Sequence, residues 1–117
     1  MTPDQRRFDR IPQPFEVKCR RSHEPLKPWI DTLTRDLSAA GMCVQSNEHF
    51  EVGALLDVQM QLPNVPGTLQ LQGRVVWQRG TVVMEYGIEF LEITPDQQAQ
   101  IDELVQFLKK RDRASDA

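Results

Sequence analysis

Residues 55–77, LLDVQMQLPNVPGTLQLQGRVVW, contain two runs in which apolar and polar residues alternate, separated by a segment rich in proline and glycine. Alternation with a period of two is typical of a half-buried β-strand, and PNVPG at 63–67 is a strong turn signal. The residues predicted to share the core face are Leu56, Val58, Met60 and Leu62, followed by Leu69, Leu71, Val75 and Trp77. The stretch therefore predicts two strands joined by a turn, with Gly73 at a bend or bulge of a curved sheet.

The same period of two predicts strands in most of the remaining chain. An alternating run begins at Phe15, further strand-like stretches cover about 29–36 and 41–46, and a final run covers 84–90. Many short strands separated by turns, followed by one helix, are typical of an antiparallel sheet that closes on itself. We therefore expect an all-β fold, a small antiparallel β-barrel, with one C-terminal helix on its wall or over an opening.

The pattern changes from strand to helix at Thr94. Thr94 is the predicted N-cap, Pro95 suits the first helical position, and Gln97 completes a capping box. The apolar residues that follow have the i, i+3, i+4, i+7 spacing of an amphipathic helix: Ile101, Leu104, Val105 and Leu108. One face of this helix is therefore expected to pack on the barrel.

The length of 117 residues fits a single domain that folds without a metal or a disulfide. Within it we expect a flexible N-terminal arm over 1–14, a barrel over 15–93 and a helix over 94–113. No apolar run approaches the ~18 residues that span a bilayer. The N-terminus also lacks the apolar core of a secretory signal, so the expected location is the cytoplasm.

Cysteine and histidine usage does not indicate a metal site. Cys19 and Cys43 are isolated, and their spacings to His23 and His49 match no compact zinc motif. In a reducing compartment the two cysteines are most simply small buried apolar residues.

The net charge of −3 argues against a protein that coats nucleic acid, but the charge is unevenly distributed. Residues 1–21 carry six Arg or Lys against three acids, a local charge of +3. Residues 85–104 carry six acids and no Lys or Arg, a local charge of −6. The N-terminal end can therefore attract a small anion, while the acidic run is either a solvated surface or a patch that faces a partner.

The N-terminal arginines are the first candidate ligand-binding group. Arg6 and Arg10 are four residues apart in RRFDR, with Arg7 between them. In an extended chain this separation is about 13 Å, similar to the span of a dinucleotide. Guanidinium groups bind phosphate through two hydrogen bonds and stack on bases, so the arm could hold an anionic nucleotide. The alternative is a solvated basic terminus.

The second candidate group lies in DLSAAG, residues 36–41. Asp36 and Ser38 point to the same side of an extended backbone, and their acceptors suit the donor edge of guanine. Gly41 permits a turn or a close approach to a ligand. The alternative is that Asp36 and Ser38 cap a turn with their own side chains. No G-x-S-x-G surrounds Ser38, so it is not expected to be a catalytic nucleophile.

The order R-x-x-x-R and then D-x-S-x-x-G resembles the PilZ family of cyclic di-GMP receptors. The first motif runs from Arg6 to Arg10, and the second consists of Asp36, Ser38 and Gly41. GRVVW at 73–77 and GIEF at 87–90 are similar to weaker signatures of the family, so the resemblance extends over nearly the whole chain. It implies a six-stranded antiparallel PilZ-type β-barrel with a C-terminal helix, which agrees with the pattern of strands.

The resemblance also implies a ligand and the residues that bind it. Family arginines grip the phosphates and bases of cyclic di-GMP, and the second motif surrounds one guanine. The implied binding residues are Arg6, Arg7, Arg10, Asp36, Ser38 and Gly41. Gln5 precedes the first arginine, where a further arginine could stand, which leaves one ligand or a stacked pair as alternatives.

The expected function is that of a non-enzymatic, bacterial, cytoplasmic receptor without cofactor or metal. Binding of cyclic di-GMP would change the conformation of the arm and signal to a separate partner protein, with no contact to DNA or RNA and no membrane insertion. One alternative is a PilZ-like protein–protein interaction module that does not bind nucleotide. A barrel that binds single-stranded nucleic acid is a further alternative, and the negative net charge counts against it.

Overall fold

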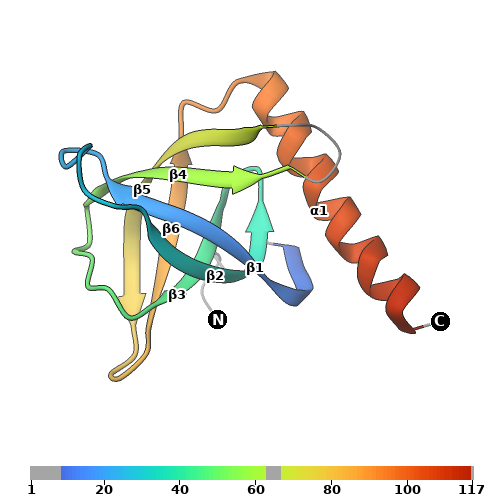
Figure 1. The fold of residues 1–117 in the computed structure, drawn as a ribbon, viewed down its shortest axis with the longest axis horizontal. Helices are drawn as coiled ribbons and strands as arrows, with labels where there is room; N and C mark the ends of the chain where they lie inside the picture. The colour runs from blue at the N-terminus through green and yellow to red at the C-terminus, as the bar shows by residue number, and fades with distance from the viewer. Residues whose placement is uncertain (1–8, 63–66, 117) are drawn as a thin grey trace.

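The computed structural model describes the backbone of residues 9–62 and 67–116, and the side chains of residues 14–34, 36–62 and 67–110. The described residues form six strands and one helix. They are β1 (Asp9–Arg21), β2 (Ile30–Ser38), β3 (Gly41–Ser46), β4 (Leu55–Gln61), β5 (Thr68–Arg79), β6 (Met84–Leu91) and α1 (Pro95–Asp116). The strands close into an antiparallel barrel in the order β1-β2-β3-β6-β5-β4, with α1 beside it (Figure 1). The predicted fold class is confirmed.

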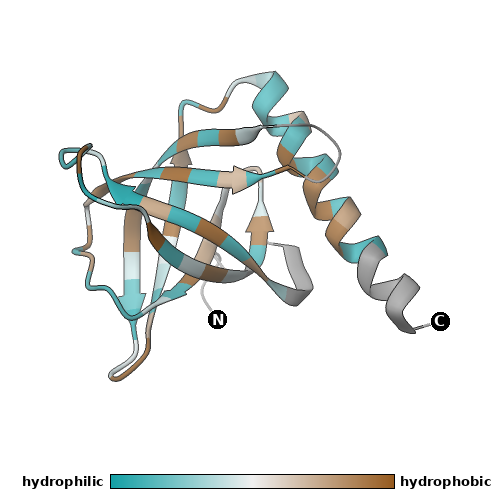
Figure 2. Ribbon diagram, in the orientation of Figure 1, coloured by the Kyte–Doolittle hydropathy of each residue, from teal (hydrophilic) through white to brown (hydrophobic). Residues whose placement is uncertain are grey.

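The β4–β5 pair has the register that the alternating pattern requires. Leu56 lies opposite Gly73, Val58 opposite Leu71, and Met60 opposite Leu69. Their apolar side chains are buried in the barrel interior. Brown and teal positions alternate along the strands in Figure 2, because successive side chains of a strand point to opposite faces.

Gly73 serves close packing rather than a bulge. A Cβ at Gly73 would lie 2.6 Å from Cγ2 of Ile88, so only glycine fits against β6 at this point. The irregularity of β5 lies further along, between Val75 and Trp77. Strand β5 therefore contains a bulge, as expected, but the bulge does not lie at Gly73.

A buried aromatic pair connects β6 to the loop after β3. The rings of Phe50 and Tyr86 meet edge to face, with centroids 5.2 Å apart. The Tyr86 hydroxyl donates to the carbonyl of Glu48 at 3.0 Å and accepts from the N–H of Phe50 at 3.1 Å. Since both polar functions are satisfied, the buried hydroxyl is accommodated without an unpaired group.

The helix begins as predicted. The Thr94 hydroxyl accepts from the N–H of Gln97 at 3.1 Å, and the Gln97 side-chain oxygen accepts from the N–H of Thr94 at 3.0 Å. This is the reciprocal capping box, which satisfies two donors of the first turn. The four apolar residues expected to face the barrel are buried: Ile101, Leu104, Val105 and Leu108. The helix packs against β1 and β2.

Two element boundaries differ from those expected. Strand β1 begins at Asp9, so residues 9–14 belong to a paired strand although the sequence assigned them to the arm. Helix α1 continues to Asp116, three residues beyond the expected end. Within the described residues there is no helix with both the length and the apolar character needed to span a bilayer.

Candidate functional site

A bulge in β2 turns the second motif toward the outer face of the barrel. Thr34 and Leu37 are both buried, although strict alternation would place only one of them inside. The register with β3 shifts between Thr34 and Asp36, which inserts one extra residue. Asp36 and Ser38 consequently lie on the outer face, on either side of the inward-facing Leu37. The prediction that these two side chains share a face is confirmed.

Two hydrogen bonds of the Thr34 hydroxyl maintain this bulge. The Thr34 hydroxyl donates to the carbonyl of Cys43 at 2.6 Å and accepts from the N–H of Asp36 at 3.3 Å. A side-chain hydroxyl thus replaces backbone partners that the bulge removes from the ladder. The position of Asp36 is therefore set by a contact between β2 and β3.

The strand register brings the two motifs together at one point. Arg10 of β1 lies directly opposite Asp36 of β2. Only the backbone of Arg10 belongs to the described part of the chain, and Arg6 and Arg7 lie outside the described residues. The described backbone thus places the last arginine of the first motif beside the first residue of the second motif.

Ser38 and Gly41 form the turn between β2 and β3. The Ser38 hydroxyl accepts from the N–H of Ala40 at 3.1 Å, so the turn-capping alternative applies to this residue. Gly41 is buried at the start of β3 and lies between Ser38 and Glu89 in the sheet. The hydroxyl proton of Ser38 is not used in this contact, so the capped turn leaves Ser38 a donor.

A pocket of about 390 Å³ lies on the outer face next to Asp36. We call it the outer pocket, and the residues that line it are Pro14, Leu33, Asp36, Cys43, Gln45, Arg79 and Glu85. Of these, only Asp36 was a candidate from the sequence. The period of two shows that Cys43, Gln45 and Glu85 alternate with core residues, but it does not show that β3 and β6 place them together.

An ion pair crosses the outer pocket from β5 to β6. Nε of Arg79 donates to Oε1 of Glu85 at 3.2 Å, and Nη2 donates to Oε2 at 3.4 Å. The hydrogen bonding of Arg79 to the Glu85 carboxylate is the main cause that raises the pKa of Arg79 above its ordinary value. Glu85 therefore stabilises the guanidinium charge of Arg79.

The thiol of Cys43 is a third group in contact with this ion pair. Sγ of Cys43 lies 3.7 Å from Oε2 of Glu85, to which it donates. Burial, followed by the charges of Glu85 and Asp36, raises the pKa of Cys43 to about 12, while Arg79 acts in the opposite direction. The thiol is consequently protonated at neutral pH, which makes it a weak donor and a poor nucleophile.

Trp77 lies on the outer face, not in the core as the alternation with Val75 predicted. The register shift between Val75 and Trp77 places Trp77 opposite Gly87. A Cβ at Gly87 would lie 2.1 Å from Nε1 of Trp77, so the indole rests on the bare backbone of the glycine. The Arg79 guanidinium is 5.3 Å from the centre of the indole ring. The bulge thus places an aromatic ring next to Arg79, a residue that lines the outer pocket.

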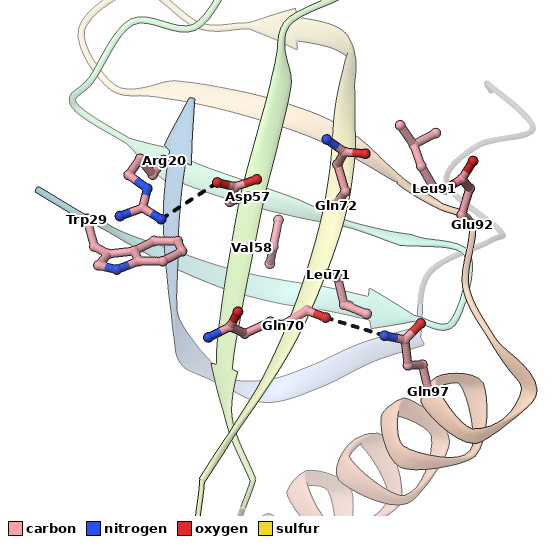
Figure 3. Close-up of a pocket in the computed structure, with 10 residues that line it drawn as sticks. All are labelled: Arg20, Trp29, Asp57, Val58, Gln70, Leu71, Gln72, Leu91, Glu92 and Gln97. Atoms are coloured by element: carbon pink, nitrogen blue, oxygen red, sulfur yellow. Dashed lines mark hydrogen bonds and ion pairs between the residues drawn. The ribbon is translucent and has the colours of Figure 1, made fainter. Parts of the chain in front are cut away.

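A second pocket, of about 260 Å³, lies under the start of α1 (Figure 3). In it the Arg20 guanidinium lies 4.0 Å from the centre of the Trp29 ring and 3.7 Å from Oδ2 of Asp57. The Gln97 side chain reaches across to the carbonyl of Gln70 at 3.4 Å. No residue of the two sequence motifs lines this pocket, which we call the Arg20 pocket.

The cysteines and histidines do not come together. Cys19 points into the core beside Thr32, and burial raises the pKa of its thiol to about 12. Cys43 lies on the outer face. Within the described ranges, no group of three or more His, Cys, Asp or Glu side chains is placed to hold a metal ion.

The fold and this site define a class: a closed six-stranded barrel with a C-terminal helix and a polar pocket on its outer wall. A sequence model of the PilZ domain matches residues 4–107, which is most of the chain. The chain therefore belongs to the PilZ domain family. A search of curated protein sequences found no match.

Solved structures of PilZ domains are similar to this chain. The PilZ domain of Escherichia coli YcgR, described with c-di-GMP, aligns with a TM-score of 0.72 at 15% identity, covering 95% of this chain and 96% of that one. The PilZ domain of CeSA from a cellulose-synthesizing bacterium aligns with a TM-score of 0.63 at 18% identity, covering 86% and 98%. MrkH of K. pneumonia aligns with a TM-score of 0.72 at 16% identity, covering 98% and 53%. At these identities the similarity concerns the fold.

Proposed function

We propose that this chain is a receptor for cyclic di-GMP that binds the ligand on the outer face of the barrel, between the arm and the β2–β3 turn. Family membership supports this proposal, as do neighbours such as the YcgR domain, which is described with c-di-GMP. The observation that carries it for this chain is the register that sets Arg10 opposite Asp36 beside the outer pocket.

The proposed binding residues contact different parts of the ligand. Arg6, Arg7 and Arg10 would grip phosphates and stack on bases, because guanidinium groups bind phosphate through two hydrogen bonds and present a flat face. The Asp36 carboxylate would accept the N–H groups of one guanine, and the Ser38 hydroxyl would donate to an acceptor of the ligand. Gly41 would shape the turn that carries both.

The proposed output is conformational and not chemical. The ligand would connect the arm to the barrel, and ordering of the arm would cost conformational entropy that lowers the net affinity. The change in the arm would then be recognised by a separate partner protein. The energy available for the signal is the difference in ligand affinity between the two arm conformations.

Calorimetric titration of the purified protein with cyclic di-GMP, with GTP as the control nucleotide, tests the proposal. We expect saturable binding of cyclic di-GMP, with a stoichiometry of one or two that distinguishes a single ligand from a stacked pair. Arg10→Ala and Asp36→Ala should each weaken binding roughly 10- to 150-fold, because hydrogen bonds to charged groups contribute about 1.5–3 kcal/mol.

Matched controls separate a local loss of contacts from a general change in charge. Asp31→Ala removes an exposed aspartate of the same strand β2 that pairs with Lys18 away from the pocket, and it should leave binding unchanged. Arg74→Ala removes an exposed arginine of β5 that does not line the outer pocket, and it should also leave binding unchanged. Absence of binding by a well-folded wild-type protein would exclude the receptor function and favour a protein–protein interaction module.

A further inference from the structure

The ion pair between Arg79 and Glu85 lies in the outer pocket, which is next to the proposed binding residue Asp36. The two residues lie directly opposite each other in the β5–β6 ladder, and both line the outer pocket. Two hydrogen bonds of 3.2 and 3.4 Å fix one edge of the guanidinium to the carboxylate. The Arg79 side chain is nevertheless 57% exposed, so a ligand can reach its other edge.

Glu85 is held more firmly than its partner. Its side chain is 31% exposed, and Oε2 also accepts from the Cys43 thiol at 3.7 Å. Cys43 belongs to β3, so the carboxylate is attached to two neighbouring strands, whereas Arg79 is attached to Glu85 and lies beside the Trp77 ring. When the pair separates, Arg79 is therefore the member that moves.

The charge of the outer pocket makes such a separation relevant to binding. Its described lining carries the carboxylates of Asp36 and Glu85 and the guanidinium of Arg79, which gives a sum of −1. Arg79 is the only cation among the described side chains that line it. Cyclic di-GMP carries two phosphodiester anions. Glu85 offsets the charge of Arg79 that would attract them, so Arg79 can bind a phosphate more strongly when it is released from Glu85.

We propose that Glu85 acts as an internal competitor for Arg79 and thereby sets the affinity of the site for cyclic di-GMP. This inference rests on the proposed function. In the free protein the carboxylate neutralises Arg79, and in the complex a ligand phosphate takes the place of the carboxylate. The cost of that exchange raises the ligand concentration at which the receptor responds. Glu85 is thus a regulatory residue of the site and not a ligand contact.

The decisive experiment measures cyclic di-GMP affinity for Glu85→Gln, Arg79→Ala and the double variant. Glutamine has nearly the shape of glutamate but does not hold Arg79 by charge. Glu85→Gln should therefore tighten binding by up to about fivefold, the range that exposed ion pairs contribute, and the gain should shrink at high salt. Arg79→Ala should weaken binding. In the Arg79→Ala background, Glu85→Gln should no longer produce the gain.

The chain offers a matched control on the same two strands. Arg74 and Glu89 also lie opposite each other in the β5–β6 ladder, are exposed, and do not line the outer pocket. Glu89→Gln removes the same charge from β6 and should change the affinity much less than Glu85→Gln. Nitrogen-15 NMR of the Arg79 Nε–H group provides a direct readout, since ligand addition and Glu85→Gln should each shift its resonance.

The outcomes distinguish this inference from the proposed function. If wild type binds and loses binding with Arg10→Ala and Asp36→Ala, but Glu85→Gln behaves like Glu89→Gln, the competitor role is wrong and the receptor function stands. Weaker binding by Glu85→Gln would also overturn it, because Glu85 would then be an acceptor for guanine. If wild type does not bind cyclic di-GMP, both proposals fall together.

Discussion

The outer pocket and the Arg20 pocket each contain an arginine that pairs with a carboxylate and lies near a tryptophan ring. In the Arg20 pocket the guanidinium lies over Trp29 at 4.0 Å, pairs with Asp57, and is 21% exposed. In the outer pocket it lies 5.3 Å from the Trp77 ring, pairs with Glu85, and is 57% exposed. The same chemistry therefore gives a packed, fixed arginine in one place and an exchangeable arginine in the other.

The difference follows from what surrounds each guanidinium. Arg20 lies so deep that its Nε is buried without a hydrogen-bond partner among the described residues. Releasing Arg20 would expose the Trp29 face and leave Asp57 without its cation. Releasing Arg79 exposes little, because water already reaches it. Exposure, more than residue type, thus decides which of the two arginines is available to a ligand.

The largest effect is expected for Gly87→Ala, which removes the support of Trp77. The new Cβ would lie 2.1 Å from Nε1 of the indole, so the ring has to move off the backbone. Overpacking of this kind costs about 1–3 kcal/mol. Urea unfolding measures the cost, and the fluorescence of Trp77 should shift toward that of an exposed indole.

The control for this prediction is the Trp77→Ala background. There Gly87→Ala has no ring to displace and should cost clearly less. A Gly87→Ala protein with wild-type stability and wild-type fluorescence would show that the indole does not rest on Gly87. The position of Trp77 beside Arg79 would then no longer support the comparison of the two pockets.

A smaller effect is expected from removing each arginine in turn. Arg20→Ala should lower the free energy of unfolding by about 1–2 kcal/mol, because it removes a largely desolvated cation–π contact and the cationic partner of Asp57. Arg79→Ala should cost less than about 1 kcal/mol, and less again in 1 M salt, because its ion pair is exposed. Urea unfolding of both variants, at low and high salt, checks the ranking. Equal costs would remove the distinction between a fixed and an exchangeable arginine.

The smallest effect at neutral pH is expected at Cys43, the thiol that only the outer pocket contains. Burial raises its pKa from 9.0 to about 12. Above pH 9 the unfolded chain loses this proton while the folded protein keeps it, so the contribution to stability is present below pH 9 and is lost between pH 9 and 12. One such thiol costs about 1.4 kcal/mol at pH 10.

The measurement compares wild type with Cys43→Ala. The difference between their unfolding free energies should be constant from pH 6 to 8 and should change in favour of Cys43→Ala as the pH rises above 9. A difference that does not depend on pH would mean that the Cys43 thiolate is accommodated in the folded protein, contrary to its position beside Glu85.

Much of the fold could be predicted because it depends on neighbours within one element. The alternating residues of β4 and β5 pair and are buried as expected, and Thr94 and Gln97 form the expected capping box. Trp77 was assigned to the wrong face for a physical reason. One extra residue between Val75 and Trp77 reverses the face of every side chain that follows, and alternation alone does not reveal it.

The candidate site, too, could be predicted from the sequence only in part. The motifs supplied the arginines of the arm, Asp36, Ser38 and Gly41 as candidates. Cys43, Arg79 and Glu85 have no motif and lie on three different strands. Cys43 and Glu85 are 42 positions apart, and Arg79 and Glu85 are 6 positions apart on the neighbouring strands β5 and β6. Their association depends on the register of β3, β5 and β6, which no single strand contains.

By itself, the sequence determined which segments become strands and helix, where the helix begins, and which short motifs are candidates for binding a nucleotide. These properties depend on backbone preferences and on the burial of one face, both of which act over a few residues. Only the tertiary structure decided that Asp36 faces outward, that Trp77 rests on Gly87, and that Glu85 holds Arg79. Those outcomes depend on bulges and cross-strand register, because the packing of a closed barrel selects one pairing among several that are locally equivalent.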